Sequence, residues 1–261
     1  LIKSYQAEDF PTLPVITQGN SFIIPAKKLI DGLRSVWYSA SLSDIKPEIA
    51  CVCVYTNGKE IVFAATDSFR LAEKKLNFDE KQDIPLLLIP YKNAIEIAKI
   101  IEHTPEDIEV FYNKNQIVFT YNSFYLASRL VDGIFPDYKQ IIPKSFKTEA
   151  VALKHDIINS LKITNFFSDK FNQVVFVINP AKKIFEITSK NTDIGENNTA
   201  VYAALSGDSL KLQFNQKYIM DCFQSIPTES VVLQMNEEGK PMVIRGVGDQ
   251  SFSYLVMPLN Q

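Results

Sequence analysis

The chain contains two histidines, His103 and His155, from which a nucleophilic active site would have to be built. A serine, cysteine or threonine nucleophile needs a histidine base within hydrogen-bond reach, and a carboxylate that orients the histidine. Neither histidine lies in a motif such as Gly-x-Ser-x-Gly. His103 falls at the expected end of a helix, where a cation interacts favourably with the helix dipole. The sequence therefore predicts no catalytic residue and a protein that is not an enzyme.

Two carboxylate pairs could act as general acid and base: Asp132 with Asp137, and Asp193 with Glu196. Both pairs occur in loop-like sequence, where solvated turn residues are the simpler interpretation. No Cys-x-x-Cys, His-Glu-x-x-His or EF-hand pattern occurs, and no glycine-rich loop for a nucleotide phosphate. We therefore predict neither a metal site nor a cofactor.

Composition is typical of a soluble globular chain. It has 261 residues, 46% of them hydrophobic, and its longest apolar runs, such as residues 84–89 and 174–178, are too short to span a bilayer. Together with the lack of a signal segment, this predicts a cytoplasmic location. The net charge of -3 excludes the global basic surface of proteins that wrap nucleic acid, so any DNA contact must be local.

Cysteine usage indicates a reducing compartment. Only three cysteines occur, and Cys51 and Cys53 are two residues apart in an apolar run. On a strand they would share one face, which is poor geometry for a bridge between them. Buried, reduced thiols are the expected state.

Four segments have apolar residues at three- and four-residue spacing, which predicts amphipathic helices over residues 25–40, 90–103, 153–167 and 215–226. Each carries a lysine three residues before an apolar position. These lysines are Lys27, Lys92, Lys154 and Lys217, at intervals of 65, 62 and 63 residues (27 to 92, 92 to 154 and 154 to 217). The regular period favours four copies of one supersecondary unit over chance spacing in an ordinary α+β protein.

A hairpin signal follows each predicted helix: two apolar, β-branched runs separated by a turn sequence. The turns fall at residues 57–58, 113–115, 179–181 and 238–239, and Asn57-Gly58 suits a type I′ turn. One helix on one small sheet cannot close a core, so two units are expected to pair about a pseudo-two-fold axis. This predicts an α+β fold of two tandem domains, residues 18–142 and 143–261, each with two helices packed on antiparallel sheets.

Three segments do not follow the repeat: residues 65–72 (ATDSFRLA), 129–138 (RLVDGIFPDY) and 254–261 (YLVMPLNQ). Together they resemble the bacterial sliding clamp, the beta subunit of DNA polymerase III. Residues 10–14, 187–191, 195–196 and 214–218 also match, in the right order along essentially the whole chain. The resemblance implies tandem domains of the DNA-clamp, or processivity, fold.

Clamps of this family have three such domains per subunit, and two subunits joined head to tail form a ring whose helices line the hole. The chain looks like the second and third domains, with residues 1–17 as a connector from a missing first domain. The resemblance implies sliding, sequence-independent contact with double-stranded DNA, and a homodimeric ring for a full-length subunit. We expect no closed ring from this segment alone; a closed dimer in light scattering would contradict that.

Basic residues on the predicted helices are the candidates for the DNA-facing surface. A sliding ring must contact few phosphates, since binding by counterion release grows with the number of phosphates neutralised. Tyr91 stands where the family often has a basic residue, which weakens the expected lining. The candidates are Lys27, Lys28, Arg34, Lys92, Lys154 and Lys217.

Partner proteins of this family insert a short peptide with apolar anchors into a cleft between the second and third domains. The resemblance implies as partners the DNA polymerase III catalytic subunit, the clamp loader, and repair and translesion polymerases. Thr66 and Arg70 are expected to hydrogen-bond the peptide, among aliphatic and methionine side chains that make an adaptable pocket. The matching positions are Ile49, Thr66, Ser68, Phe69, Arg70, Leu71, Pro136, Ile141, Leu255, Val256, Met257, Pro258, Leu259 and Asn260.

Two departures from the family pattern bear on this cleft. Ser68-Phe69 replaces the commoner Gly-His pair, and Asn260 stands where a basic residue is frequent. The added aromatic ring is expected to narrow or reshape the pocket. We also expect the double substitution of Met257 and Leu71 by alanine to abolish peptide binding without unfolding the domains.

Two other classes of function remain open on the residues alone. A structural assembly module without a DNA role would suit the acidic charge balance. A metal-free hydrolase or transferase in a two-domain α+β shell would need a polar constellation in a pocket, and none is visible in the sequence.

Overall fold

Each predicted amphipathic segment contains a helix, and a strand leads into every one. Pro25 and Pro90 end the strands before the first two helices, with backbone φ angles of -56° and -49°. Asn215 caps the fourth helix, because its side chain accepts a hydrogen bond from the Lys217 backbone N–H. The second helix ends at Ile100, so His103 lies in the turn beyond it.

The computed structural model describes residues 16, 19–78, 83–104, 106–122, 124–168, 170–237 and 239–259. The expected connector over residues 1–17 lies outside this range except for Ile16. None of the helices in the described ranges is long and apolar enough to cross a bilayer.

The first domain contains two units of similar order. Unit one comprises β1 (Asn20–Pro25), α1 (Ala26–Val36), the 3-10 turn η2 (Trp37–Ser39), β2 (Cys51–Asn57), β3 (Glu60–Thr66) and β4 (Arg70–Asn77). Unit two comprises β5 (Leu87–Pro90), α2 (Tyr91–Ile100), β6 (Asp107–Tyr112), β7 (Gln116–Tyr121) and β8 (Phe124–Arg129). The short turn η3 (Tyr138–Ile141) lies in the segment that leads to the second domain.

The second domain repeats this order with one additional strand. Unit three comprises β9 (Thr148–Leu153), α3 (Lys154–Asn165), β10 (Gln173–Asn179), β11 (Ile184–Asn191) and β12 (Gly195–Ala200). Unit four comprises β13 (Ala203–Gly207), β14 (Leu210–Asn215), α4 (Gln216–Cys222), η4 (Phe223–Ser225), β15 (Ser230–Met235), β16 (Met242–Gly246) and β17 (Phe252–Val256).

Each domain is held together by an exchange of strands between its two units. β1 of unit one pairs with β6 of unit two, and β5 of unit two pairs with β2 of unit one. In the second domain β9 pairs with β15, and β14 pairs with β10. The strand before each helix thus extends the sheet of the other unit, which gives the predicted pseudo-two-fold arrangement.

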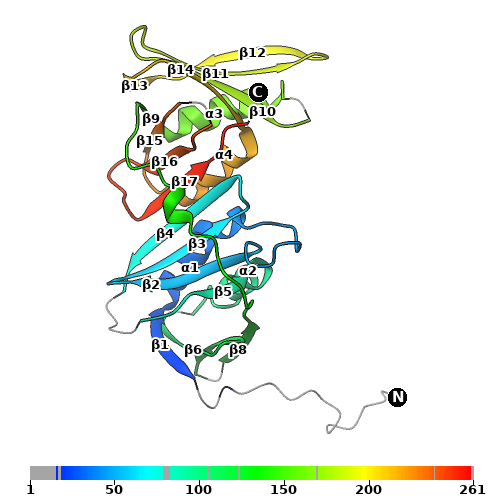
Figure 1. Ribbon diagram of the computed structural model, residues 1–261, viewed down its shortest axis with the longest axis vertical. Helices are drawn as coiled ribbons and strands as arrows, with labels where there is room; N and C mark the ends of the chain where they lie inside the picture. The colour runs from blue at the N-terminus through cyan, green and yellow to red at the C-terminus, as the bar shows by residue number, and fades with distance from the viewer. Residues whose placement is uncertain are drawn as a thin grey trace.

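A nine-stranded sheet joins the two domains in the order β13-β9-β15-β16-β17-β4-β3-β2-β5. The junction is the antiparallel pair β17 and β4, in which Leu255 lies opposite Leu71. Four-stranded sheets, β1-β6-β7-β8 and β12-β11-β10-β14, lie at the two ends of the elongated molecule (Figure 1). Continuous backbone pairing across the junction fixes the two domains against each other.

Two details of the repeat differ from the prediction. The strand that precedes each helix was not predicted, because such strands are four to six residues long and end at the helix start, two of the four in proline. In the first hairpin Asn57 pairs with Glu60, so Gly58 and Lys59 are the central turn residues. Of these two only Gly58 has a positive φ, 64°, so the turn is not type I′.

The three cysteines are free and buried, as predicted. Burial, reinforced by Glu48, raises the pKa of Cys51 to about 12, and burial also raises the pKa values of Cys53 and Cys222. Since an unfolded thiol has a pKa of about 8.5, the unfolded chain loses these protons first as the pH rises.

We therefore expect the free energy of unfolding to fall as the pH rises from about 8.5 towards the folded pKa values. We also expect the three thiols to resist a thiol reagent at pH 8 in the folded protein and to react fully in denaturant. Absorbance after addition of an aromatic disulfide measures both states. Rapid reaction of the folded chain would contradict the burial of these thiols.

Candidate functional site

A pocket of about 140 Å³ opens where the two domains meet. The turn between β3 and β4 forms one wall, the segment around η3 forms another, and the end of β17 closes the third side. We call it the junction pocket. Its lining residues are Thr66, Ser68, Phe69, Arg70, Leu71, Pro136, Asp137, Tyr138, Ile141, Pro241, Leu255 and Met257.

Hydrogen bonds within the β3–β4 turn fix its shape. Asp67 Oδ1 accepts from the backbone N–H groups of Phe69 and Arg70, both at 3.0 Å. Thr66 Oγ1 donates to the Arg70 carbonyl at 2.7 Å and accepts from the Ser68 N–H at 3.2 Å. Ser68 has a φ of 78°, a left-handed conformation that glycine adopts more readily. The turn therefore accommodates serine under backbone strain.

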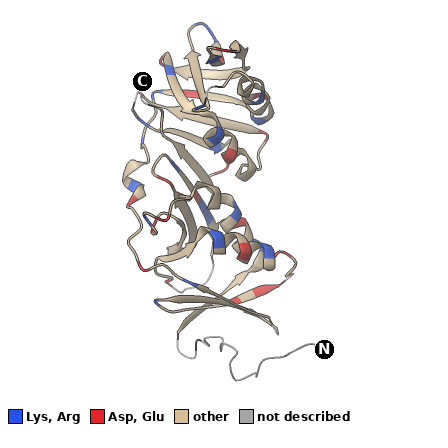
Figure 2. Cartoon of the chain, turned by 90° about the vertical axis from the view of Figure 1, so that its right-hand side faces the viewer, with Lys and Arg blue, Asp and Glu red and all other residues tan. Residues whose placement is uncertain are grey.

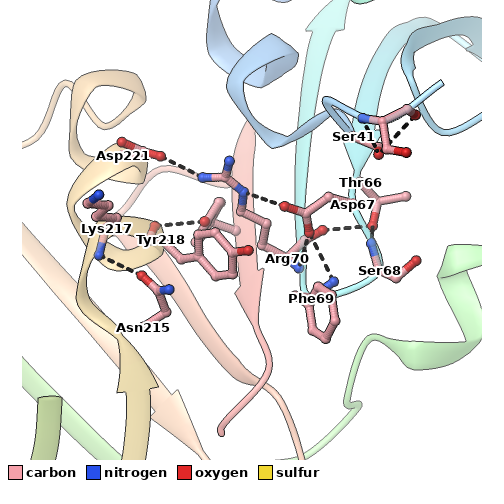
Figure 3. A network of polar contacts seen from close by, with 12 residues as sticks. Ser41, Thr66, Asp67, Ser68, Phe69, Arg70, Asn215, Lys217, Tyr218 and Asp221 are labelled. Atoms are coloured by element: carbon pink, nitrogen blue, oxygen red, sulfur yellow. Dashed lines mark hydrogen bonds and ion pairs between the residues drawn. The ribbon is translucent and has the colours of Figure 1, made fainter. Parts of the chain in front are cut away.

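Arg70 connects this turn to the second domain. Its Nε lies 2.9 Å from Asp67 Oδ2, and its Nη1 lies 2.6 Å from Asp221 Oδ2 on α4. The guanidinium also stacks over the Tyr218 ring, 4.4 Å from its centroid (Figure 3). The Arg70 side chain is only 9% exposed. Thr66 Oγ1 and the Arg70 guanidinium are thus already hydrogen-bonded within the chain, and their contact with a peptide stays a prediction.

A second polar network fixes the opposite wall. The Tyr138 hydroxyl donates to Glu73 Oε2 at 2.6 Å and lies 2.8 Å from the Tyr55 hydroxyl. Lys75 Nζ lies 2.8 Å from the other oxygen of Glu73, so this buried carboxylate is paired. Burial, followed by the Glu73 charge, raises the pKa of Tyr138 far above its ordinary value, so the hydroxyl remains a donor. The segment that carries Pro136 and Ile141 is held against the sheet as a result.

The sequences of both halves match known domain families. Residues 19–137 match the central domain of the DNA polymerase III beta subunit, and residues 139–260 match its C-terminal domain. The chain belongs to the sliding clamp family of DNA polymerase III beta subunits.

Similar proteins agree with this membership. The beta sliding clamp of Staphylococcus epidermidis is 25% identical over 253 residues, which cover 97% of this chain and 67% of that clamp. The Synechocystis clamp is 26% identical over 273 residues, which cover 99% of this chain and 70% of that protein. The structure of the Bacillus subtilis sliding clamp superposes with a TM-score of 0.93 at 26% identity, over 98% of this chain and 68% of the Bacillus chain. The structure of the Thermotoga maritima beta subunit superposes with a TM-score of 0.92 at 26% identity, over 98% of this chain and 70% of the Thermotoga chain.

Most residues assigned to the cleft of this clamp lie together in the junction pocket. Exceptions are Ile49 and Val256, which are 6% and 0% exposed and do not line it, and Pro258 and Leu259, which follow β17. Asn260 lies outside the described residues. The nine predicted residues that line the pocket are Thr66, Ser68, Phe69, Arg70, Leu71, Pro136, Ile141, Leu255 and Met257.

Three lining residues were not predicted: Asp137, Tyr138 and Pro241. Asp137 and Tyr138 follow Pro136 in the family-like segment 129–138. The assignment of Pro136 to the cleft could therefore have indicated them as well. Pro241 comes from the β15–β16 loop, and nothing in its local sequence indicates the pocket. Phe69 lines the pocket and is 61% exposed, and the narrowing expected from its ring stays a prediction.

The candidate DNA-facing residues on the clamp helices differ in exposure and in their hydrogen bonds within the chain. Lys27, Lys92 and Lys217 are exposed near the helix starts. Lys28 Nζ donates to the Asn77 carbonyl at 2.8 Å, and Lys154 Nζ donates to the Ile226 carbonyl at 2.6 Å. Figure 2 shows both basic positions (blue) and acidic positions (red) on the helices that are turned towards the viewer.

The charge of Arg34 is neutralised by an ion pair with Glu102. Its Nη2 lies 2.8 Å from Glu102 Oε2, and both side chains are about two-fifths exposed, at 41% and 42%. The guanidinium lowers the pKa of the Glu102 carboxyl, which stays charged. One of the six candidate cations is therefore already paired with a carboxylate.

Among the described residues no group of three or more histidine, cysteine, aspartate or glutamate side chains could hold a metal ion. His155 is exposed, with Nε2 3.0 Å from Asp156 Oδ1.

Proposed function

We propose that this chain works as part of a sliding clamp that encircles duplex DNA and tethers DNA polymerase III and other replication and repair proteins, without catalysing a reaction itself. Family membership supports the proposal that the full subunit forms a ring that encircles DNA. The observation that carries the tethering role is the junction pocket, in which three separate segments with family-like sequence converge. Neither alternative raised by the sequence is supported, since the matched families and the similar proteins above are all clamps.

Chemistry of the junction pocket suits a short peptide with apolar anchors. Leu71, Leu255 and Met257 supply an aliphatic floor, and Phe69 and Ile141 are exposed at its edge. A small apolar pocket with hydrogen-bonded, rigid walls loses little entropy on binding. We infer that the polymerase, the clamp loader and repair or translesion polymerases compete for this pocket.

The domain division that we propose falls near Ile142 and Pro143. The segment from residue 130 to residue 147 connects β8 to β9 and contains one short turn, η3. It crosses the outer face of the shared sheet, where Phe135 and Tyr138 pack on Cys53, Leu71 and Leu255. Residues 18–142 and 143–261 then correspond to the central and C-terminal clamp domains.

The experiment that tests the tethering role is fluorescence polarisation with a labelled peptide of the Gln-Leu-x-Leu-Phe type. We expect saturable binding by the chain at micromolar concentration or below. Competition by unlabelled peptide is the control for specific binding. A folded chain, shown by circular dichroism, that does not bind would refute the proposed tethering site.

The DNA role has its own test in the ring formed by a full-length subunit. A ring that encircles DNA remains on closed circles and leaves linear molecules by sliding off their ends. We expect retention on circular DNA to be lost when the circle is cut once. Equal retention on both forms would indicate an ordinary DNA binder.

Replacing Glu102 by glutamine is expected to strengthen sequence-independent DNA binding, because it releases Arg34 from its ion pair. One additional phosphate contact changes the slope of log K against log salt by about 0.9. Anisotropy of a labelled duplex over a range of salt concentrations measures this slope.

Glu96→Gln is the matched control for this change, since Glu96 is on α2, just before the turn that carries Glu102, and is paired with Lys99 rather than with a candidate DNA-facing residue. An equal increase in both variants would show that only net charge matters.

A further inference from the structure

A larger pocket of about 440 Å³ lies beside the junction pocket and shares three residues with it, Pro136, Asp137 and Tyr138. We call it the outer pocket. It lies between β2, the segment before β5 and the segment that leads to η3. Its lining residues are Cys53, Tyr55, Thr56, Asp83, Ile84, Pro85, Leu86, Phe135, Pro136, Asp137, Tyr138 and Lys139.

The outer pocket is preformed, because hydrogen bonds attach its outer wall to β2. The Thr56 backbone N–H donates to the Ile84 carbonyl at 3.1 Å, and the Ile84 N–H donates to Thr56 Oγ1 at 2.8 Å. Thr56 Oγ1 also donates to Asp83 Oδ1 at 3.1 Å. Leu86 follows this anchored stretch and is 46% exposed, so an apolar side chain stands at the pocket edge. A fixed apolar wall is a ready surface for a bulky apolar side chain.

Charges around the outer pocket favour a cation. Asp83 and Asp137 are exposed and line it, against one lysine, Lys139. Lys139 Nζ lies over the Tyr55 ring, 5.2 Å from its centroid. The Tyr55 and Tyr138 hydroxyls are bonded to each other and Tyr138 to Glu73, so both are already engaged. The charged groups that line the pocket are therefore two carboxylates and one ammonium, and one oxygen of each carboxylate already accepts a hydrogen bond, Asp83 Oδ1 from Thr56 and Asp137 Oδ2 from Gln140.

We propose that the outer pocket binds a second part of the same partner peptide that enters the junction pocket: a bulky apolar residue with a basic residue beside it. The proposal rests on the proposed tethering function. Pro136, Asp137 and Tyr138 form the wall common to both pockets, so a peptide crossing this wall reaches both. An extended chain advances about 3.3 Å per residue, so a few residues bridge the two pockets.

The second contact adds affinity because it forms within a complex already held by the anchors. A short flexible link gives the second peptide segment an effective concentration in the millimolar range. Even a weak contact in the outer pocket therefore raises the affinity of the whole peptide. The outer pocket would thus rank partners by the residues that flank their anchors, while the junction pocket recognises what they share.

The test compares an anchor-only peptide with two extended ones, which carry an Arg-Leu pair on a short glycine–serine link at the N-terminal or the C-terminal side. We expect one extension to bind roughly tenfold tighter, a gain within what two linked contacts provide. An Asp-Leu pair on the same link should gain less. Isothermal titration or polarisation gives the affinities.

Variants of the protein locate the gain. Leu86→Ser should remove most of it and Asp83→Asn part of it, while anchor-only binding stays unchanged in both. Ile134→Ser is the matched control, since Ile134 is 90% exposed and lines neither pocket. A gain that persists in Leu86→Ser, or no gain from either extension, would overturn the proposal, and an equal gain from the acidic pair would overturn its charge assignment.

Failure of the tethering function is distinguishable from failure of this proposal. If the anchor-only peptide does not bind the folded chain, the tethering site is wrong. The detached Arg-Leu flank peptide then still probes the outer pocket directly. Amide shifts at Leu86 and Lys139 on titration would support the outer pocket, and no shifts at millimolar peptide would refute it.

Discussion

Replacing Met257 and Ile141 together by alanine is expected to weaken peptide binding about a hundredfold and to leave the fold intact. Both side chains line the junction pocket, and truncating an anchor contact typically costs about 1 to 2 kcal/mol, close to tenfold in affinity for each. Ile141 is 51% exposed and Met257 partly buried, so neither is a core residue whose loss unfolds the chain. Polarisation with the anchor peptide measures binding, and a thermal melt measures stability.

The matched control is Ile134→Ala, which removes the same kind of exposed aliphatic side chain from the same connecting segment outside the pocket. It should bind as the unmodified chain does. If the double variant kept its affinity, the peptide would have to bind elsewhere, and the junction pocket would lose its assigned role.

Leu71 is a poorer target than the sequence suggested. The pair Leu71→Ala with Met257→Ala was expected to spare the fold, but Leu71 is 1% exposed and packs with Cys53, Phe135 and Leu255. Removing such a side chain typically costs about 2 to 5 kcal/mol of stability. Loss of binding in that pair could therefore reflect unfolding, which is why Ile141 replaces Leu71 in the experiment above.

The repeat and its helices were predictable because the information is local. Apolar residues at three- and four-residue spacing, such as Leu29, Leu33 and Val36, are buried on one side of α1. A lysine near the start of each helix made the period visible. The strands before the helices were not predictable in this way, since four to six residues carry little periodicity and their partners lie in another unit.

The family-like segments predicted the junction pocket, but they did not predict the polar contacts that hold its walls in place. Arg70 and Asp221 are 151 residues apart, and no spacing rule connects them. Tyr138 and Glu73 are 65 residues apart and meet only because the connecting segment crosses the shared sheet. The sequence identified the residue types at the pocket, but it could not say which polar groups are already satisfied within the chain.

Replacing Arg70 by alanine is expected to lower the free energy of unfolding by roughly 3 kcal/mol, which is at the lower end of what breaking a buried ion pair costs. The lower end applies because Asp221 is 41% exposed and water partly compensates it, whereas Asp67 is only 14% exposed. Arg70→Lys should recover little, since lysine lacks the planar fork that reaches two carboxylates and stacks on Tyr218. Urea unfolding monitored by circular dichroism gives the stability.

Asp221→Asn separates the stabilising role of this network from direct contact with a peptide. Asp221 does not line the junction pocket, and asparagine keeps an oxygen that accepts the Arg70 hydrogen bond while it removes the charge. If Arg70 positions the β3–β4 turn, this variant should lose stability moderately and peptide affinity by a few fold. A double-mutant cycle with Arg70→Ala and Asp221→Ala then measures the coupling, which should be at least about 1 kcal/mol for charges in direct contact. Additive effects would mean that the Arg70–Asp221 pair does not help to fix the two domains against each other, and that Arg70 serves only the wall of its own domain.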